Sequence, residues 1–238
     1  MKTSNKLLSL IGLIVFSFIV FYNIKLKAEY NKGNYKNRFY GMDEVKIDGF
    51  NSIENNASNL NVRIEYGNKF KIYYGSEMKK KIEFKKNKDA LIIDFQKNYN
   101  EDDYFRTDSV IIICPKIEHI RAGNLLSKKQ NIDYYIPLAS TTIYGFKQEN
   151  LNLIANSFTD IRLENNVINQ VTAIIGDSRS TSGILSIKHN NQINNLYTQL
   201  NGKSILNIEN TSINNAKFNL SDSAKVNLTG RALKLLKN

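Results

Sequence analysis

A four-residue stretch, Ile193-Asn194-Asn195-Leu196, returns twenty residues later as Ile213-Asn214-Asn215-Ala216. A similar stretch, Ile168-Asn169-Gln170-Val171, precedes the first by 25 residues. A repeat of this length is one turn of chain that cannot bury its own apolar face, so successive turns must stack and share a core. The sequence therefore predicts a β-solenoid in which the three stretches occupy the same point on three successive turns.

Apolar and polar residues alternate inside each predicted turn, as in Leu196, Thr198 and Leu200. A period of two is the period of a β-strand. Residues 150–238 also contain eighteen asparagines. Since Asn tolerates left-handed backbone angles and can form amide ladders between turns, these residues are interpreted as structural corners. A leucine-rich repeat is the alternative architecture, and it would need a helical or turn-rich segment in every repeat.

Two hairpins are predicted before the repeats. The first turns at Gly67-Asn68, inside an alternating stretch that covers residues 60–74. The second turns at Asn87-Lys88-Asp89. Its lysines, within residues 79–88, are separated by apolar residues, which predicts an amphipathic hairpin with a solvated basic face.

An uncharged segment of sixteen residues, Leu7–Tyr22, lies near the N-terminus between flanking lysines. As a helix extended through Ile24 it would span about 27 Å at about 1.5 Å per residue, close to the hydrocarbon core of about 30 Å. The sequence therefore predicts a transmembrane or signal-anchor helix. The residues expected inside the membrane are Leu7, Leu8, Ile11, Leu13, Ile14, Val15, Phe16, Phe18, Ile19, Val20 and Phe21.

Cleavage of this segment is disfavoured by its sequence. The best candidate site, Leu26-Lys27-Ala28, has a bulky residue where a small one is expected and follows a charge. We therefore predict an uncleaved anchor over residues 1–28, a basic tether over 29–40 and a single domain over 41–238. A soluble form secreted after cleavage is the alternative.

The charges around the segment conflict with export. More basic residues follow it than precede it, which by the positive-inside rule would place the domain in the cytoplasm. The β-rich, nearly cysteine-free body is instead of the kind that is usually exported. We expect a protein of the cell envelope whose domain lies in the periplasm or outside the cell, with the orientation left open by the lysines.

The net charge of +11 is concentrated at the N-terminus. The first 38 residues carry +6 of it, and the other 200 carry only +5. A lysine cluster beside a membrane segment more often contacts lipid headgroups or cell-wall polyanions than nucleic acid. We therefore expect a membrane partner through the N-terminal segment and no nucleic-acid partner.

Metal and nucleophile chemistry has little support in the sequence. Cys114 ends an apolar strand and is expected to be a buried, inert thiol. His119 and His189 are seventy residues apart and lack a metal-ligand spacing. The acidic residues 101–103 with Asp108 could hold Ca²⁺, but a solvated loop explains them more simply. No phosphate loop or GxSxG motif is found, so we expect no cofactor and no metal.

Three short blocks carry a family resemblance. The first block is the Phe-x-x-Ile of Phe50 and Ile53 together with the predicted strand that ends at Gly67. The second block is residues 110–124, and the third is residues 224–232. In this order they resemble the opening, the next block and the end of the auto-transporter adhesin head GIN domain family, over about residues 45–235. The resemblance implies an all-β, right-handed parallel β-helix of the bacterial cell envelope with an adhesive role. It implies no catalytic residues.

A β-helical polysaccharide lyase or glycoside hydrolase is the alternative function. Asp160, Arg162 and Glu164 alternate onto one face, and Asp177 and Arg179 lie in the loop of the next turn. In a hydrolase, two carboxylates could act as acid and base on a glycosidic bond. In a lyase, a basic residue with a bound cation could remove the proton next to a substrate carboxylate. Alternating opposite charges on an exposed sheet are, however, commonly cross-strand pairs. We therefore predict that the protein is not an enzyme.

Tyrosines near the start of the repeats are candidate ligand contacts. Tyr134, Tyr135 and Tyr144 could stack on sugars, or they could cap the first turn. The sequence as a whole predicts a membrane-anchored, non-enzymatic binding or adhesion module of the bacterial envelope, with envelope glycans or another envelope protein as partner. A sensing role is a third possibility, for which the chain offers little machinery.

Overall fold

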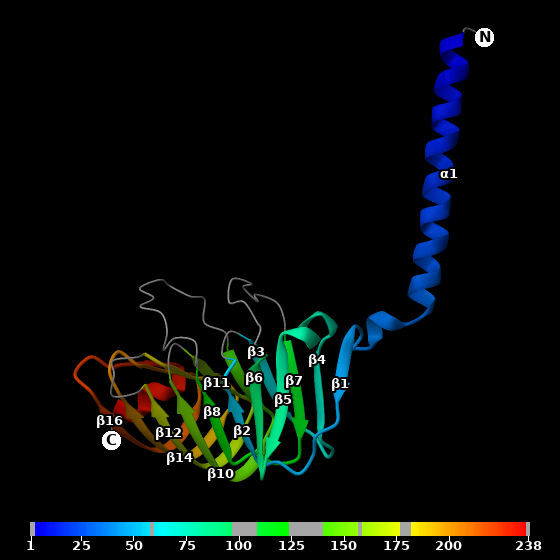
Figure 1. Cartoon of the computed structure of the whole chain (residues 1–238). Helices are drawn as coiled ribbons and strands as arrows, with labels where there is room; N and C mark the ends of the chain where they lie inside the picture. The colour runs from blue at the N-terminus through cyan, green and yellow to red at the C-terminus, as the bar shows by residue number, and fades with distance from the viewer. Residues whose placement is uncertain are drawn as a thin grey trace. The chain divides into compact units, whose positions relative to one another are not determined.

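The computed structural model describes residues 3–57, 60–96, 109–123, 140–156, 159–176 and 182–236. The chain divides into two compact units, Met1–Met42 and Asp43–Asn238. The first unit contains the α-helix α1 (Thr3–Asn31) and the short 3-10 helix η1 (Asn34–Lys36). The second unit is a β-domain (Figure 1).

The central part of helix α1, Leu7–Tyr22, carries no charge on any side, and none of the helix's described residues is buried. Its mean hydropathy reaches 2.4 over eighteen residues. A helix that is apolar on all sides must be buried somewhere, and one this long is of the kind found in membranes. The N-terminal helix thus fits a signal anchor or a signal peptide, while the predicted division at residues 28 and 40 stays a prediction.

The described part of the β-domain forms two sheets. The nine-stranded sheet has the order β1-β4-β7-β3-β9-β11-β13-β15-β17. Its strands are β1 (Met42–Val45), β4 (Lys71–Gly75), β7 (Ser109–Cys114), β3 (Asn61–Tyr66), β9 (Ser140–Tyr144), β11 (Asp160–Glu164), β13 (Ile184–Ile187), β15 (Ile205–Glu209) and β17 (Lys225–Thr229).

The eight-stranded sheet has the order β16-β14-β12-β10-β8-β2-β6-β5. Its strands are β16 (Ser212–Leu220), β14 (Gln192–Leu200), β12 (Val167–Ile175), β10 (Lys147–Ala155), β8 (His119–Ala122), β2 (Ser52–Asn55), β6 (Ala90–Phe95) and β5 (Ile82–Asn87). The second unit also contains two 3-10 segments, η2 (Ser76–Lys80) and η4 (Gly230–Leu236).

The predicted right-handed parallel β-helix is wrong. The strands form two sheets of mixed strand direction and no closed solenoid, because β4 pairs antiparallel with β7 and β5 pairs antiparallel with β6. The physical reason lies in the N-terminal half, where Lys88 takes a left-handed backbone angle (φ 54°) and reverses the chain between β5 and β6. The repeats that suggested a uniform helix occupy only the C-terminal part.

The predicted register of the repeats is confirmed. Ile168 pairs with Ile193, and Ile193 pairs with Ile213, across the parallel strands β12, β14 and β16. Between these strands the chain enters the nine-stranded sheet as β13 and β15, which also pair in parallel. Each repeat therefore contributes one strand to each sheet, and the core includes Leu163, Leu185 and Leu206 from one sheet and Val171, Leu196 and Ile193 from the other.

The corners of the repeats depend on asparagine, as predicted. Asn165, Asn190 and Asn210 have positive φ angles of 57°, 65° and 46°. The following residue in two of these corners, Asn166 and Asn191, is buried. Asn191 Oδ1 accepts a hydrogen bond from the Asn166 backbone N–H (2.9 Å), and Asn191 Nδ2 donates to the carbonyl oxygen of Leu163 (2.8 Å). Asn191 thus satisfies the buried Asn166 N–H and adds a second hydrogen bond to the Leu163 carbonyl, which also accepts from the Lys188 N–H.

Candidate functional site

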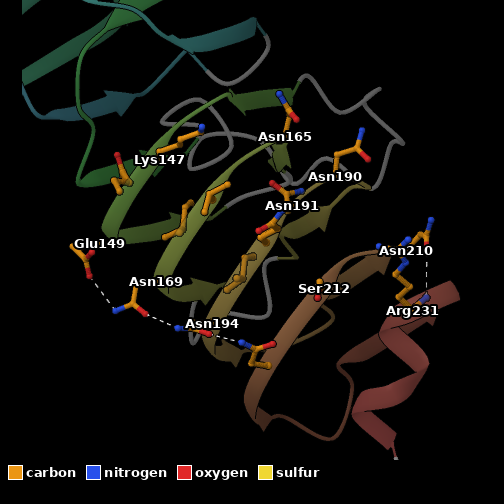
Figure 2. Close-up of a pocket in the computed structure, with 16 residues that line it drawn as sticks. Lys147, Glu149, Asn165, Asn169, Asn190, Asn191, Asn194, Asn210, Ser212 and Arg231 are labelled. Carbon is orange, nitrogen blue, oxygen red and sulfur yellow. Dashed lines mark hydrogen bonds between the residues drawn. The ribbon is translucent and has the colours of Figure 1, made fainter.

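A groove of about 1090 Å³ lies over the first halves of β10, β12, β14 and β16 and over the corners that precede three of them (Figure 2). Because the four strands are parallel and in register, equivalent positions stack into columns at about 4.8 Å per strand. The groove therefore presents the same chemistry several times along its length.

One column of the groove is a hydrogen-bonded ladder. Asn169 Nδ2 donates to Glu149 Oε2 (3.1 Å), Asn194 Nδ2 donates to Asn169 Oδ1 (3.0 Å), and Asn214 Nδ2 donates to Asn194 Oδ1. In Figure 2 the dashed lines from Glu149 through Asn169 and Asn194 follow this ladder from strand to strand. We call Glu149, Asn169, Asn194 and Asn214 the amide ladder. Each bond fixes the rotation of an amide that would otherwise turn freely at the surface.

A break in strand alternation creates the room for the ladder. In β14, Asn194 and Asn195 are consecutive residues outside the core, between the buried Ile193 and Leu196. The equivalent residues of β16, Asn214 and Asn215, are both exposed, and Asn215 Nδ2 donates to Asn195 Oδ1 (3.1 Å). Two successive outward side chains cannot belong to a regular pleat, so each strand bends at the same point.

The amide ladder retains hydrogen-bonding capacity. An asparagine side chain has two N–H donors and an oxygen with two lone pairs. The ladder bonds of Asn194 use one donor and one lone pair. One N–H and one lone pair on each internal amide therefore remain for a bound molecule, and their directions are already fixed by the ladder.

The groove is almost neutral. Among its described lining residues the charged ones are Lys147 and Glu149 on β10 and Arg231 in η4. Asn210 Oδ1 accepts a hydrogen bond from the Arg231 backbone N–H (3.4 Å). Charge among the described lining residues is thus confined to the two ends of the row of strands. The middle is lined by amides and a hydroxyl, including Gln192 and Ser212, and by the apolar Val167, Ile168 and Ile193.

The charged residues predicted to share a face lie together on β11 in the nine-stranded sheet. Asp160 is 4% exposed, pairs with Arg162 Nε at 2.6 Å from Oδ2, and accepts a hydrogen bond from Ser186 Oγ at Oδ1 (3.1 Å). Glu164 Oε2 lies 3.6 Å from Arg63 Nη1. Both carboxylates are therefore engaged by neighbouring side chains, which is the arrangement of ion pairs within a sheet. A catalytic role for them stays the untested alternative to the prediction that the protein is not an enzyme.

Tyr144 is 37% exposed at the end of β9. The guanidinium carbon of Arg63 lies 4.5 Å from the centroid of its ring, so an arginine occupies part of the surface that a sugar would need. Its role as a ligand contact stays a prediction. The other candidate residues, Tyr134, Tyr135, Asp177 and Arg179, lie outside the described part of the chain, as do Glu101, Asp102, Asp103 and Asp108, for which a solvated loop was predicted.

The predicted inert cysteine is confirmed. Cys114 is fully buried in β7, and burial raises the pKa of its thiol to about 12. The thiol is therefore protonated at any physiological pH and is a poor nucleophile. Within the described residues no group of three or more His, Cys, Asp and Glu side chains is placed to hold a metal ion.

The groove was not predicted from the sequence. The asparagines were predicted to be structural, which their ladders and corners confirm, but a structural ladder also leaves donors and acceptors facing outward. The signal was present in the paired polar residues Asn194-Asn195 and Asn214-Asn215, which interrupt an otherwise regular alternation at the same register.

No family model and no curated protein matches the chain. A putative adhesin from Bacteroides fragilis NCTC 9343 matches with a TM-score of 0.54 at 10% identity, covering 79% of this chain and 96% of that one. A putative adhesin from Parabacteroides merdae ATCC 43184 has a TM-score of 0.40 at 13% identity and covers 79% and 95%. A putative lipid binding protein from Parabacteroides distasonis ATCC 8503 has a TM-score of 0.38 at 9% identity and covers 79% and 94%. At 10% identity, the likeness to the Bacteroides fragilis structure shows that the two chains share a fold.

Proposed function

We propose that this protein is a membrane-anchored, extracytoplasmic binding module of the bacterial cell envelope, related to the adhesin head GIN domain family, and that it binds an uncharged, hydroxyl-rich polymer such as an envelope glycan. The observation that carries this proposal is the amide ladder, which lines an almost neutral groove across four parallel strands.

The chemistry of the ladder suits hydroxyl groups. A hydroxyl both donates and accepts, and each internal amide offers one N–H and one lone pair in a fixed direction. The groove repeats this pair of one donor and one acceptor at the spacing of the strands, which favours a ligand that is extended and periodic. Among the described lining residues, a charged polymer would find counter-charges at the ends alone, at Glu149, Lys147 and Arg231.

The same groove is poorly equipped for cleavage. Glycoside hydrolysis ordinarily needs two carboxylic acids on either side of the bond. Among the described residues that line the groove, Glu149 is the one carboxylate, and it accepts a hydrogen bond from Asn169. Binding without turnover is therefore the better-supported function of this surface.

Two further features support an envelope location. Helix α1 has the length and apolarity of a membrane segment, and the fold is shared with a Bacteroides fragilis protein described as a putative adhesin. A domain tethered to the membrane and carrying a binding groove suits an envelope module. The basic residues that follow the apolar segment oppose this orientation under the positive-inside rule. Protease digestion of the domain in intact spheroplasts tests it: digestion from outside supports export, and protection until lysis contradicts it.

The test of the groove is a binding assay with immobilised neutral glycans, comparing the full chain with Asn169→Ala. Loss of an oriented donor and acceptor should weaken binding by about tenfold. Asn227→Ala is a matched control, because Asn227 Nδ2 also donates to an asparagine, Asn207 (2.8 Å), but on the nine-stranded sheet. Equal losses in the two variants, or no saturable binding to any neutral glycan, would contradict the proposal.

A further inference from the structure

Lysines are concentrated at one end of the β-domain. Residues 76–88 contain six lysines and two glutamates, a net charge of +4. The segment includes η2 and β5, and β5 is the outermost strand of the eight-stranded sheet. We call the six lysines the basic edge: Lys79, Lys80, Lys81, Lys85, Lys86 and Lys88.

Much of this charge is not neutralised by the protein. Five of the six lysines are exposed. Lys85 pairs with Glu83, and Lys86 Nζ donates to the carbonyl oxygen of Asp48 (2.7 Å), which leaves its charge uncompensated. Within the described residues, no acidic side chain forms an ion pair with Lys79, Lys80 or Lys88. Lysines on an outer strand also discourage edge-to-edge pairing, but Lys79 and Lys80 precede the strand and are not explained by that role.

The basic edge is connected to the point where the chain enters the domain. Ser76 Oγ, at the start of η2, donates to Asp43 Oδ1 (3.2 Å) at the start of the second unit. Asp43 follows the end of α1 at Asn31 by twelve residues. Such a segment reaches at most about 43 Å, so Asp43 stays within that distance of the helix end in any placement of the two units.

We propose that the basic edge docks on anionic lipid headgroups of the membrane that holds α1. This inference rests on the retained anchor of the proposed function. The short connection keeps the local concentration of membrane surface high, and lysines within a Debye length of an anionic surface are attracted to it. The connecting segment itself adds Lys32, Lys36 and Arg38.

Docking would also orient the groove. In the eight-stranded sheet, β10 lies four strands and β16 seven strands from β5. At about 4.8 Å per strand these separations are about 19 Å and 34 Å. A domain that rests on its basic edge therefore holds the groove strands away from the bilayer, where an envelope polymer can reach them.

The experiment places the full chain in lipid nanodiscs and measures the distance of two positions from the headgroups. Because Cys114 is buried and unreactive, a cysteine introduced at the exposed Asn87 or Asn219 can be labelled selectively with a fluorophore. Headgroup-attached nitroxide lipids quench a label that lies at the surface. Discs of zwitterionic lipid alone are compared with discs that also contain phosphatidylglycerol.

We expect position 87 to be quenched at least about twofold more in anionic than in zwitterionic discs, with the difference lost in high salt, and position 219 to be insensitive to lipid charge. Replacing four basic-edge lysines with glutamine should remove the difference in quenching at position 87 between the two kinds of disc. Replacing four lysines in other parts of the domain with glutamine should leave that difference in place. The test set is Lys79, Lys80, Lys85 and Lys88; the control set is Lys203, Lys217, Lys225 and Lys234, all exposed.

The outcomes separate the two proposals. A chain that does not co-purify with the discs overturns the anchor and the docking with it. A chain that is incorporated but shows the same quenching at position 87 in both lipids overturns the docking alone. Equal loss of quenching in the two glutamine variants would also overturn it, since the basic edge would then have no special role.

Discussion

Asn194 on β14 donates a side-chain hydrogen bond to Oδ1 of Asn169 on β12 (3.0 Å), so two exposed amides twenty-five residues apart hold each other in a fixed rotamer. In an isolated exposed asparagine the amide would rotate and solvate freely, and fixing it would cost side-chain entropy when a ligand binds. The ladder meets that cost during folding. This is why an ordinary structural device can also serve as a preorganised binding surface.

The first prediction concerns Asn194→Asp, which keeps the shape of the side chain and replaces its N–H donors with an acceptor. The new carboxylate faces Asn169 Oδ1, so the ladder bond is lost and a charge enters the neutral groove. We expect glycan affinity to fall about tenfold or more, with a loss of at most about 1 kcal/mol in unfolding free energy because the site is exposed. Binding curves and urea denaturation measure the two quantities. A variant that binds as well as the native chain would show that the ladder does not contact ligand.

The second prediction concerns the buried corner at Asn191. Its Oδ1 accepts from the Asn166 backbone N–H (2.9 Å) and its Nδ2 donates to the carbonyl oxygen of Leu163 (2.8 Å). Asn191→Ala removes the partner of the buried Asn166 N–H and one of the two hydrogen bonds to the Leu163 carbonyl oxygen, which still accepts from the Lys188 N–H (3.0 Å). The variant should therefore lose about 2 kcal/mol of unfolding free energy. The exposed Asn227→Ala is the comparison and should cost less than about 1 kcal/mol. Urea titrations of both variants decide, and equal losses would disprove the assigned role.

The third prediction concerns Asn190, whose backbone φ is 65°. Glycine adopts this region without strain, whereas a β-branched residue does not. Asn190→Gly should therefore leave stability within about 0.5 kcal/mol of the native value, and Asn190→Val should lower it by about 1–2 kcal/mol. Thermal melts of the pair test this order. If the glycine variant is the less stable of the two, the side chain and not the backbone angle is what the corner requires.

The fourth prediction uses the buried thiol. The folded pKa of Cys114 is about 12, raised by burial from an ordinary value of 9.0. Above about pH 9 the unfolded chain loses this proton while the folded chain keeps it. The thiol's contribution to the unfolding free energy is therefore fully present below pH 9 and is lost as the pH rises towards 12. The native protein should resist maleimide at neutral pH and react once unfolded in urea. Rapid labelling of the native state would mean that β7 opens or that the thiol is accessible.

Some of the fold could be predicted because local pattern determines it. The register of Ile168, Ile193 and Ile213 follows from their spacing, and the β5–β6 hairpin follows from the turn at Lys88. Alternation reports the two faces of a strand and not the identity of its neighbours. The turn at Gly67-Asn68 therefore predicted that β3 and β4 pair, whereas β7 lies between them, parallel to β3 and antiparallel to β4.

The candidate site was less predictable for a related reason. Asp160, Arg162 and Glu164 were expected to share a face because their spacing is two, and they do lie on one strand. The spacing could not reveal the partners from other strands: Ser186 donates a hydrogen bond to Asp160, and Arg63 forms an ion pair with Glu164. The groove depends on a bend repeated in four strands, which is a property of their stacking and not of any one of them.

The fifth prediction separates structure from catalysis at Asp160. Since Asp160 is 4% exposed and accepts from Ser186 Oγ, Asp160→Ala should lower the unfolding free energy by about 1–3 kcal/mol. Its partner Arg162 is 39% exposed, so the ion pair itself is screened and contributes little of this loss. The native chain should release no products from envelope or plant polysaccharides, measured as new reducing ends or unsaturated uronates. Product release that Asp160→Ala abolishes without loss of stability would contradict the binding proposal. The protein would then be a carbohydrate-active enzyme with its catalytic site on the nine-stranded sheet, and the groove would have a secondary role.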